Sequence, residues 1–381
     1  ATLVEVCKRL VKQVPDDRRA QRWASELARR LKMKDQLPLT PLPWARAPKR
    51  SALGPPVKWL TGFRNLDVSQ IVDQPDFANH LGRFYVACGL ALQGVSAAQI
   101  GTNLVAPSES MLRGIHNLVP RRAASQAWGV DLGNSCLKAV KLQRDAKTKR
   151  LRVTDCQLIP FDKHLSQATG EDELERLQVD ALKKFKSQRD GDHAVLCAGI
   201  SGLQTLGRFF EMPRIDSRKK FAEAARYEIE HQMPYPQKDV CWDFCDLSAA
   251  PAPDNPAAPH YVVLTVVKKM TRDRRVSIFE HADLQVDIMQ SDCLALHNCV
   301  VHELFETSDP QARDVHRDAS KNPDAVVTID VGAASTSVVV SARDYAWFRT
   351  FALGGDDFTR NLVHEFRLTF ARAEQVKCQP S

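Results

Sequence analysis

The sequence predicts a two-lobed α/β fold, because one local pattern occurs twice, far apart in the chain. In each copy an apolar strand ends in Asp-x-Gly, a turn of small polar residues follows, and a second strand begins. The first copy contains Asp131 and the second Asp330, 199 residues later (330 − 131). One strand followed by a glycine turn is common, but two such units in equivalent places indicate two related lobes.

The first copy is expected to form three strands. Ala127–Leu132 is a short apolar strand, Asn134-Ser135 forms a polar turn, and further strands are predicted at Leu137–Leu142 and near Leu151–Leu158. These runs are short and bounded by turn residues, as is typical of strands.

The second copy repeats this order. Strands are predicted at Ala325–Val331, Ser337–Val340 and Tyr345–Leu353, with a turn at Ala333-Ala334-Ser335 and a hairpin at Arg343-Asp344. Gly354-Gly355 then leads into a helix that we expect to be capped by Asp356 or Asp357.

The part before residue 127 is predicted to be mostly helical. Residues 1–32 show two amphipathic helical patterns, 34–57 are proline-rich and predict a loop, and a helix is expected from about Asn79 to Gln93. Two further stretches, Ala249–Pro259 and Thr307–Pro323, are expected to be surface loops.

The composition is that of a globular protein. The chain has 381 residues, of which 44% are hydrophobic and 26% charged, and a net charge of +7. It contains no run of about 18 apolar residues that would predict a membrane-spanning helix. Its ten cysteines are irregularly spaced and favour free thiols. Basic clusters such as Lys147 to Arg150 have no interleaved aromatic residues, which favours solvated faces over a nucleic-acid surface.

The two turns have the chemistry of a phosphate site. Turns of glycine and small polar residues expose successive backbone N–H groups, which bind phosphate oxygens. Asp131 and Asp330 are too negative to touch phosphate, so we expect them to hold Mg²⁺ through water. Hydroxyls of Ser135, Ser335 and Thr336 are further donors. Lys138 could reach a phosphate, or could be an exposed strand lysine.

Several separate segments resemble the PilM and FtsA group of actin-like proteins, and the PilM branch most. Trp128–Leu142 is similar to their first phosphate motif, Thr328–Ser337 to the second, and Arg349–Arg360 to the segment that follows. Ser201–Pro213, the helix exit Glu228–Pro236 and Asp287–Leu296 resemble segments of PilM itself. The resemblance covers about Trp128 to Lys377.

The resemblance implies an actin-like (ribonuclease H-like) two-lobed ATPase fold, with an inserted α+β subdomain and a mostly helical N-terminal segment before it. Residues 127–306 would be the first lobe, with the insertion at about 190–283, and 324–381 the truncated start of the second. ATP and Mg²⁺ are the implied cofactors. The expected nucleotide-binding residues are Asp131, Gly133, Asn134, Ser135, Lys138, Asp330, Gly332, Ala333, Ser335, Thr336, Gly354 and Gly355.

The same resemblance implies a cytoplasmic scaffold of type IV pilus or related secretion assembly. A PilN-like N-terminal peptide at the inner membrane would be the partner, together with other assembly components and possible self-association, while membrane contact would come only through a partner. Phe84–Gln93 resembles the last helix of a PilM-like domain, and Thr102–Pro107 resembles the Asn-Leu-Leu-Pro element by which PilN docks. Residues 1–126 are therefore expected to end a preceding PilM-like module.

Two other functions stay open from sequence. A sugar- or acid-kinase relative would need a base for the acceptor hydroxyl, and no clear candidate exists, although Gln204 could orient a water. At most, slow ATP hydrolysis is expected. A degenerate module without nucleotide is the third reading, because Ala333 replaces a common glycine and the glycine pair that holds adenosine would lie beyond Lys377.

Overall fold

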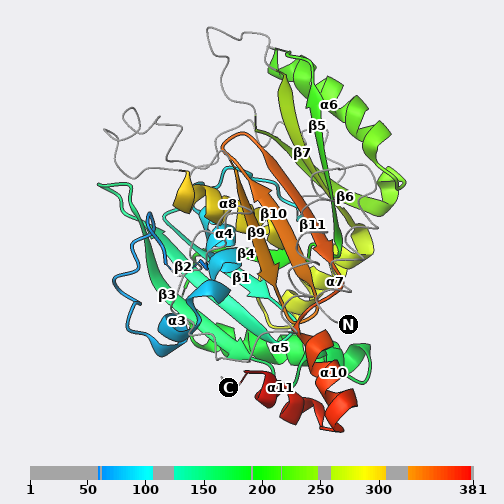
Figure 1. Cartoon of the computed structure of the whole chain (residues 1–381). Coiled ribbons are helices and arrows are strands. Elements are labelled where there is room, and N and C mark those ends of the chain that lie inside the picture. The colour runs from blue at the N-terminus through cyan, green and yellow to red at the C-terminus, as the bar shows by residue number, and fades with distance from the viewer. Residues whose placement is uncertain are drawn as a thin grey trace, which may run out of the picture. The chain divides into compact units, whose positions relative to one another are not determined.

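The computed structural model describes residues 59–60, 62–105, 124–189, 192–215, 217–247, 259–305 and 325–378 (Figure 1). Two compact units make up the chain. The larger contains residues 60–330 and 337–351, and the smaller contains 331–336 and 352–381 with the residues up to Trp59. The helices expected within 1–32, the loop 34–57, most of Ala249–Pro259 and all of Thr307–Pro323 lie outside the described residues.

A five-stranded mixed sheet is the centre of the larger unit. Its order is β3-β2-β1-β4-β8, with bounds β1 Gln126–Leu132, β2 Cys136–Arg144, β3 Leu151–Pro160, β4 Val195–Ile200 and β8 Ile288–Ser291. The strands β1, β2 and β3 are antiparallel neighbours, whereas β1, β4 and β8 run parallel. This strand order is that of the ribonuclease H-like fold, so the expected fold class is confirmed.

Residues alternate between two apolar layers along these strands. Ala127, Val140 and Cys197 face one core, which includes helix α4 (Tyr85–Gly94) and helix α8 (Asp292–Leu304). Trp128, Ala139 and their neighbours face a second core, formed with helix α5 (Glu171–Ser187) and helix α7 (Lys269–Glu280). The period of two along each strand thus buries both faces of the sheet.

The N-terminal helix differs from its prediction. The expected single helix from Asn79 to Gln93 is divided into helix α3 (Pro75–His80), the 3₁₀ turn η2 (Leu81–Arg83) and α4. All ten residues of α4 are buried. An amphipathic stripe is therefore absent from this helix, because sheet and helix cover it on all sides.

Glycines allow α4 to approach its neighbours closely. A Cβ added to Gly89 would lie 1.7 Å from the Ala295 carbonyl oxygen on α8, and one added to Gly129 would lie 1.9 Å from the Ala87 carbonyl oxygen. No side chain fits at either place. The packing of α4 against α8 and β1 thus depends on these two residues.

A second sheet forms the insertion. It has the antiparallel order β5-β7-β6, with bounds β5 Thr205–Met212, β6 Val240–Asp246 and β7 His260–Lys268. Helix α6 (Arg218–Gln232) packs on it through Phe221, Ala225 and Ile229, spaced four residues apart. Met233 follows the helix in an extended conformation, because the next residue is proline. The short turns η3 (Leu165–Gln167) and η4 (Gln237–Asp239) complete these parts.

The second copy of the repeated pattern is also observed. Strands β9 (Val326–Val331), β10 (Thr336–Ser341) and β11 (Ala346–Phe351) form a sheet of order β11-β10-β9, and helices α10 (Gly355–Phe366) and α11 (Phe370–Cys378) follow. The predicted cap is confirmed in part: Gly354 is the N-cap residue, and Asp357 in the first turn accepts from the Gly354 amide at 2.8 Å. Asp356 is buried.

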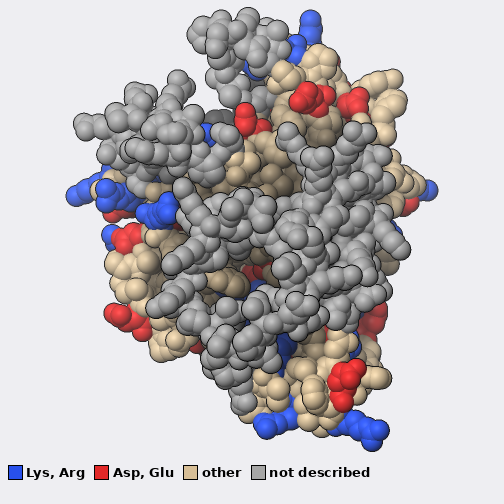
Figure 2. Space-filling view, viewed as in Figure 1, with Lys and Arg blue, Asp and Glu red and all other residues tan. Residues whose placement is uncertain are grey.

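The basic cluster Lys147–Arg150 lies at the exposed end of the β2–β3 hairpin. Lys147, Lys149 and Arg150 are exposed, and Figure 2 shows basic side chains at the left edge, where Figure 1 places this hairpin end. Asp145 accepts from the Lys147 and Thr148 amides, which closes the turn. The cluster is thus a solvated turn.

Candidate functional site

The first Asp-x-Gly turn begins with an ion pair across the hairpin. Asp131 on β1 and Lys138 on β2 are partners in the strand register, and the Lys138 Nζ lies 2.5 Å from the Asp131 Oδ2. Both side chains are mostly buried. Although burial alone would lower the pKa of Lys138, the negative charge of Asp131 raises it above its ordinary value. The lysine is therefore held as a cation.

The turn itself offers backbone amides. The Gly133 amide donates to the Cys136 carbonyl at 3.1 Å, while the carbonyls of Asn134 and Ser135 accept from Leu165 and Phe161. Among the described residues, the amides of Asn134 and Ser135 donate to no acceptor. The turn is thus fixed through its carbonyl groups and leaves two N–H donors for a ligand.

Asp330 joins this pair from the other copy of the pattern. It is the penultimate residue of β9. As a residue, Asp330 is exposed. Desolvation of its carboxyl raises the pKa of Asp330, the positive charge of Lys138 lowers it, and the negative charge of Asp131 raises it. The two strand-end aspartates therefore lie close enough for their charges to interact. Lys138 interacts electrostatically with both of them.

Sequence reasoning missed a third carboxylate. Asp292 begins α8, directly after β8, and its Oδ1 accepts from the Gly202 amide at 2.8 Å. Burial, then the negative charges of Asp131 and Asp330, raise the pKa of Asp292 to about 7. Asp287–Leu296 resembles a family segment in sequence, but nothing in that pattern marks Asp292 as part of a charged cluster.

Arg275 is the other residue that the sequence did not indicate. It lies on α7, where burial lowers its pKa and the charges of Asp131 and Asp292 raise it. The larger unit thus gathers three aspartates, Lys138 and Arg275. Carboxylates in this number are typical ligands of Mg²⁺, directly or through water.

The smaller unit contains the second turn and the glycine pair, which pack on each other. The Gly355 amide donates to the Gly332 carbonyl at 2.9 Å, and the Asp356 amide to the Ala333 carbonyl at 2.8 Å. A Cβ on Gly354 would lie 2.3 Å from the Ala333 carbonyl oxygen. Glycine is therefore required at 354.

The second turn also leaves donors available. The Gly332 amide donates to the Ser335 carbonyl, and the Thr336 hydroxyl donates to the Leu353 carbonyl at 2.7 Å. Within the described part of the chain, the amides of Ala333, Ala334 and Ser335 reach no acceptor. Because Thr336 is bonded to the backbone, its hydroxyl stabilises the turn.

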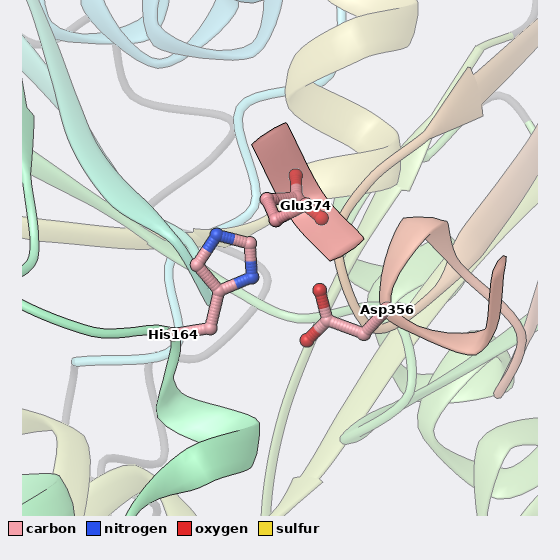
Figure 3. A group of neighbouring side chains, drawn as sticks. All are labelled: His164, Asp356 and Glu374. Atoms are coloured by element: carbon pink, nitrogen blue, oxygen red, sulfur yellow. The ribbon is translucent and has the colours of Figure 1, made fainter. Parts of the chain in front are cut away.

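A polar cluster joins the two helices after the glycine pair. The Lys377 Nζ donates to the Gly355 carbonyl at 3.1 Å and to the Thr359 hydroxyl at 3.0 Å, and it pairs with Glu374 at 2.6 Å. Figure 3 shows the Asp356 and Glu374 carboxylates, which come from α10 and α11 respectively; His164, also drawn, belongs to the larger unit. Lys377 thereby fixes the start of α10 to α11.

Other sequence candidates stay apart from these residues. Gln204, considered for orienting a water, is exposed and its backbone amide donates to the Ser201 carbonyl. Cys241 and Cys245, both on β6, are free thiols. No helix in the described residues is long and apolar enough to cross a membrane.

Comparisons with known proteins point to one family. A sequence profile described as type IV pilus assembly protein PilM matches residues 129–381. No curated protein sequence matches the chain.

Solved structures also resemble the chain. A PilM-PilN type IV pilus biogenesis complex is 21% identical, with a TM-score of 0.47 and coverage of 66% of this chain and 68% of that one. The cytoplasmic domain of EpsL, an inner membrane component of the Vibrio cholerae type II secretion system, is 10% identical (TM-score 0.34; 64% and 78% covered). The ethanolamine utilization protein EutJ from Carboxydothermus hydrogenoformans is 12% identical (TM-score 0.30; 68% and 63% covered).

Proposed function

Because the chain belongs to the type IV pilus assembly protein PilM family, we propose that it is an ATP-binding scaffold of pilus assembly. The observation that carries the nucleotide part is the cluster of Asp131, Asp330 and Lys138. Two carboxylates at strand ends and one buried cation form a charge pattern suited to Mg²⁺ and a polyphosphate together.

Residues of both turns supply the remaining contacts in this proposal. The N–H groups of Asn134 and Ser135 donate to phosphate oxygens, as free amides in small-residue turns do elsewhere. The second turn carries donors of the same kind at Ala333 and Ser335. Asp131 and Asp330 hold Mg²⁺ through water, and Lys138 contributes a positive charge beside them. Gly133, Gly332, Gly354 and Gly355 keep the turns narrow enough for backbone to approach the ligand.

The residues also fit a scaffold better than a phosphotransferase. Transfer to a sugar or carboxylic acid needs a base beside the acceptor hydroxyl. The sequence offers no clear candidate for this base, and Gln204, which was considered only for orienting a water, is exposed. Positioning and Mg²⁺ alone would support slow hydrolysis at most.

We further propose a location and partners. The scaffold is cytoplasmic and sits at the inner membrane through a PilN-like N-terminal peptide, with other pilus or secretion components as additional partners. In this reading 127–306 is the first lobe, 324–381 begins the second, and residues up to 126 derive from the end of a preceding module.

Titration with a fluorescent ATP analogue, with and without Mg²⁺, tests the nucleotide site. Asp131→Ala and Asp330→Ala are each expected to weaken binding roughly tenfold or more in Mg²⁺, since each removes a charge that faces the metal. Without Mg²⁺ the loss should shrink, because the removed carboxylate then only repels phosphate.

Asp180→Ala, on the exposed face of α5, is the matched control and should bind like the wild type. If all three variants bound the analogue as tightly as the wild type, the assignment of the nucleotide site would be wrong, whereas the family membership would stand. Pull-down with PilN-like N-terminal peptides separately tests the partner, and turnover assays with sugars and carboxylic acids test the kinase alternative.

A further inference from the structure

Three arginines lie within one turn of helix α7, and their surroundings differ. Arg272 donates from its Nη1 to the Val105 carbonyl at 3.2 Å, and the exposed Arg274 pairs with Glu171 at 3.0 Å. Among the described residues, the Arg275 guanidinium has no ion-pair partner, and its buried Nη1 has no hydrogen-bond acceptor. Arg275 therefore differs from its two neighbours in having no group that neutralises it.

A guanidinium in this position is unfavourable for the chain alone. Arginine stays protonated at any physiological pH, so the charge cannot be removed by loss of a proton. Long cationic side chains usually avoid burial by reaching water with their heads, but the Arg275 Nη1 is buried. A buried charged donor without an acceptor destabilises the folded state. The missing acceptor is therefore expected to come from a ligand.

The charges that act on Arg275 belong to carboxylates that already have partners. Arg275 interacts electrostatically with Asp131 and Asp292, but it forms an ion pair with neither. The Asp131 Oδ2 lies 2.5 Å from the Lys138 Nζ, and the Asp292 Oδ1 accepts from the Gly202 amide at 2.8 Å. Arg275 is thus a member of the charged cluster whose donor groups are not used within it.

A second set of unused donors lies beside the same aspartate. The first turn follows Asp131 directly, and the amides of Asn134 and Ser135 donate to no acceptor in the described part of the chain. The turn, Asp131 and Arg275 all belong to the larger unit. Backbone amides in a turn and a guanidinium both favour oxyanions. Two independent observations therefore indicate an anionic ligand at this place.

We propose that Arg275 is a phosphate-binding residue, whose guanidinium donates to an oxygen of the polyphosphate that also meets the amides of the first turn. The planar fork of arginine suits this ligand, because two of its N–H groups can bind two phosphate oxygens in parallel. The inference deepens the proposed function by adding a binding residue, and it rests on that function only for the identity of the ligand as a nucleotide.

A second cation answers an electrostatic need of the site. Magnesium leaves a polyphosphate with a net negative charge, which Asp131, Asp292 and Asp330 repel. Lys138 is already paired with Asp131, so its charge is partly neutralised before the ligand arrives. Arg275 adds a positive charge that is not paired, and in a buried site its attraction for phosphate is only weakly screened.

Magnesium tripolyphosphate is the first probe, because it has the phosphate chain without a nucleoside. Its affinity for the full chain is measured by isothermal titration calorimetry. Arg275→Met is expected to bind roughly tenfold more weakly than the wild type, since it loses charge-assisted hydrogen bonds. Arg274→Met is the matched control: it removes a cation from the adjacent position and breaks only the surface pair with Glu171, so it should bind like the wild type.

Thermal unfolding without ligand provides a second readout. If Arg275 only stabilised the fold through the two aspartates, Arg275→Met would melt at a lower temperature than the wild type. A residue that waits for a ligand costs stability instead, so we expect the melting temperature to be equal or higher. Wild-type affinity for tripolyphosphate in Arg275→Met, or a clearly lower melting temperature without ligand, would overturn the proposal.

If Arg275→Met does not fold, Arg275→Lys decides. Lysine keeps the charge but loses the fork, so binding of tripolyphosphate should weaken roughly threefold, and wild-type affinity would refute the assignment.

A fluorescent ATP analogue, titrated into the same preparations, separates this inference from the proposed function. A wild type that binds tripolyphosphate but not the analogue would lose the nucleotide function and keep the role of Arg275. A wild type that does not bind tripolyphosphate would remove that role.

Discussion

Lys138 and Asp131 face each other across the first hairpin, with the lysine Nζ 2.5 Å from the carboxylate Oδ2. A nearby pair on the same strand provides a natural comparison. Lys141 lies 2.8 Å from Asp192, and its side chain is about as exposed as that of Lys138 (20% against 18%). The two lysines differ mainly in what surrounds them. Of the two, only Lys138 lowers the pKa of Asp330.

Lys138→Met should therefore weaken ATP binding roughly tenfold, which corresponds to about 1.4 kcal/mol. Lys141→Met should change thermal stability about as much as Lys138→Met does, but it should leave nucleotide affinity unchanged. Both are measured by fluorescent nucleotide titration and by thermal unfolding. Equal nucleotide affinities in the two variants would mean that Lys138 only stabilises the hairpin.

Asp292 should make the proposed Mg²⁺ affinity depend on pH. Its pKa is raised to about 7, so it holds a proton below that pH and is ionised above it. Because Mg²⁺ favours the ionised form, metal affinity should rise as the pH increases from 6 to 8. Without metal, the folded state holds a proton that the unfolded state releases, so this group's contribution to stability falls as pH rises from about 4 to about 7.

Asp292→Asn should remove the change in Mg²⁺ affinity between pH 6 and pH 8, as measured by calorimetry. A wild-type affinity that is flat over this range would show that Asp292 does not sense the metal.

Substitutions at the α4 contacts should be costly. Gly89→Ala and Gly129→Ala each place a methyl group within 2 Å of a backbone oxygen, and overpacking of a core typically costs about 1–3 kcal/mol, occasionally more. Gly101→Ala meets nothing within 4 Å and serves as the control. Chemical denaturation should show a lower midpoint for the first two only. Unchanged midpoints would mean that α4 shifts to make room.

His297 should make the free energy of unfolding depend on pH in the acidic range. It is fully buried, and burial lowers its pKa to about 4. Its Nε2 donates to the Gln99 Oε1 at 2.8 Å, and its Nδ1 accepts from Ser341. The unfolded chain takes up a proton near pH 6.5 and the folded one does not, so stability should fall between pH 6.5 and about 4, by at most about 3 kcal/mol.

His297→Gln should flatten this part of the stability curve, whereas His231→Gln, at an exposed position of α6, should leave it as in the wild type. Denaturant titrations at several pH values measure the effect. An identical acid dependence in His297→Gln would assign it to other groups.

The strands could be predicted from sequence because their signals are local. Short apolar runs beside Asp-x-Gly turns predicted β1, β2, β9 and β10 within one or two residues. Helix α4 was predicted with the wrong extent, since a new helix begins at Tyr85, after Phe84, where the pattern suggested continuity. Its burial on all sides also depends on α8 and β1, which are distant in sequence, and periodicity alone carries no information about them.

The candidate site could be predicted only in part for a similar reason. Asp131 and Lys138 are register partners in one hairpin, so local reasoning can pair them. Asp292 and Arg275 come to the same place through β8 and α7, after a long insertion, and neither lies in a motif. Thr102–Pro107 resembles a docking element in sequence, but the bonds of Asn103 and Leu104 to β8 appear only in three dimensions.

The glycine contacts of α4 have a consequence for how such genes recombine. Gly129 and Ala295 belong to the stretch that matches the family, whereas Gly89 and Ala87 precede it. A crossover between residues 105 and 124 would separate the domain from helix α4. The new domain would then lack a helix that fits closely against Gly129 and Ala295. Inheritance of this domain is therefore expected to carry the upstream helix along, and the unit that evolution can shuffle is larger than the unit that sequence comparison detects.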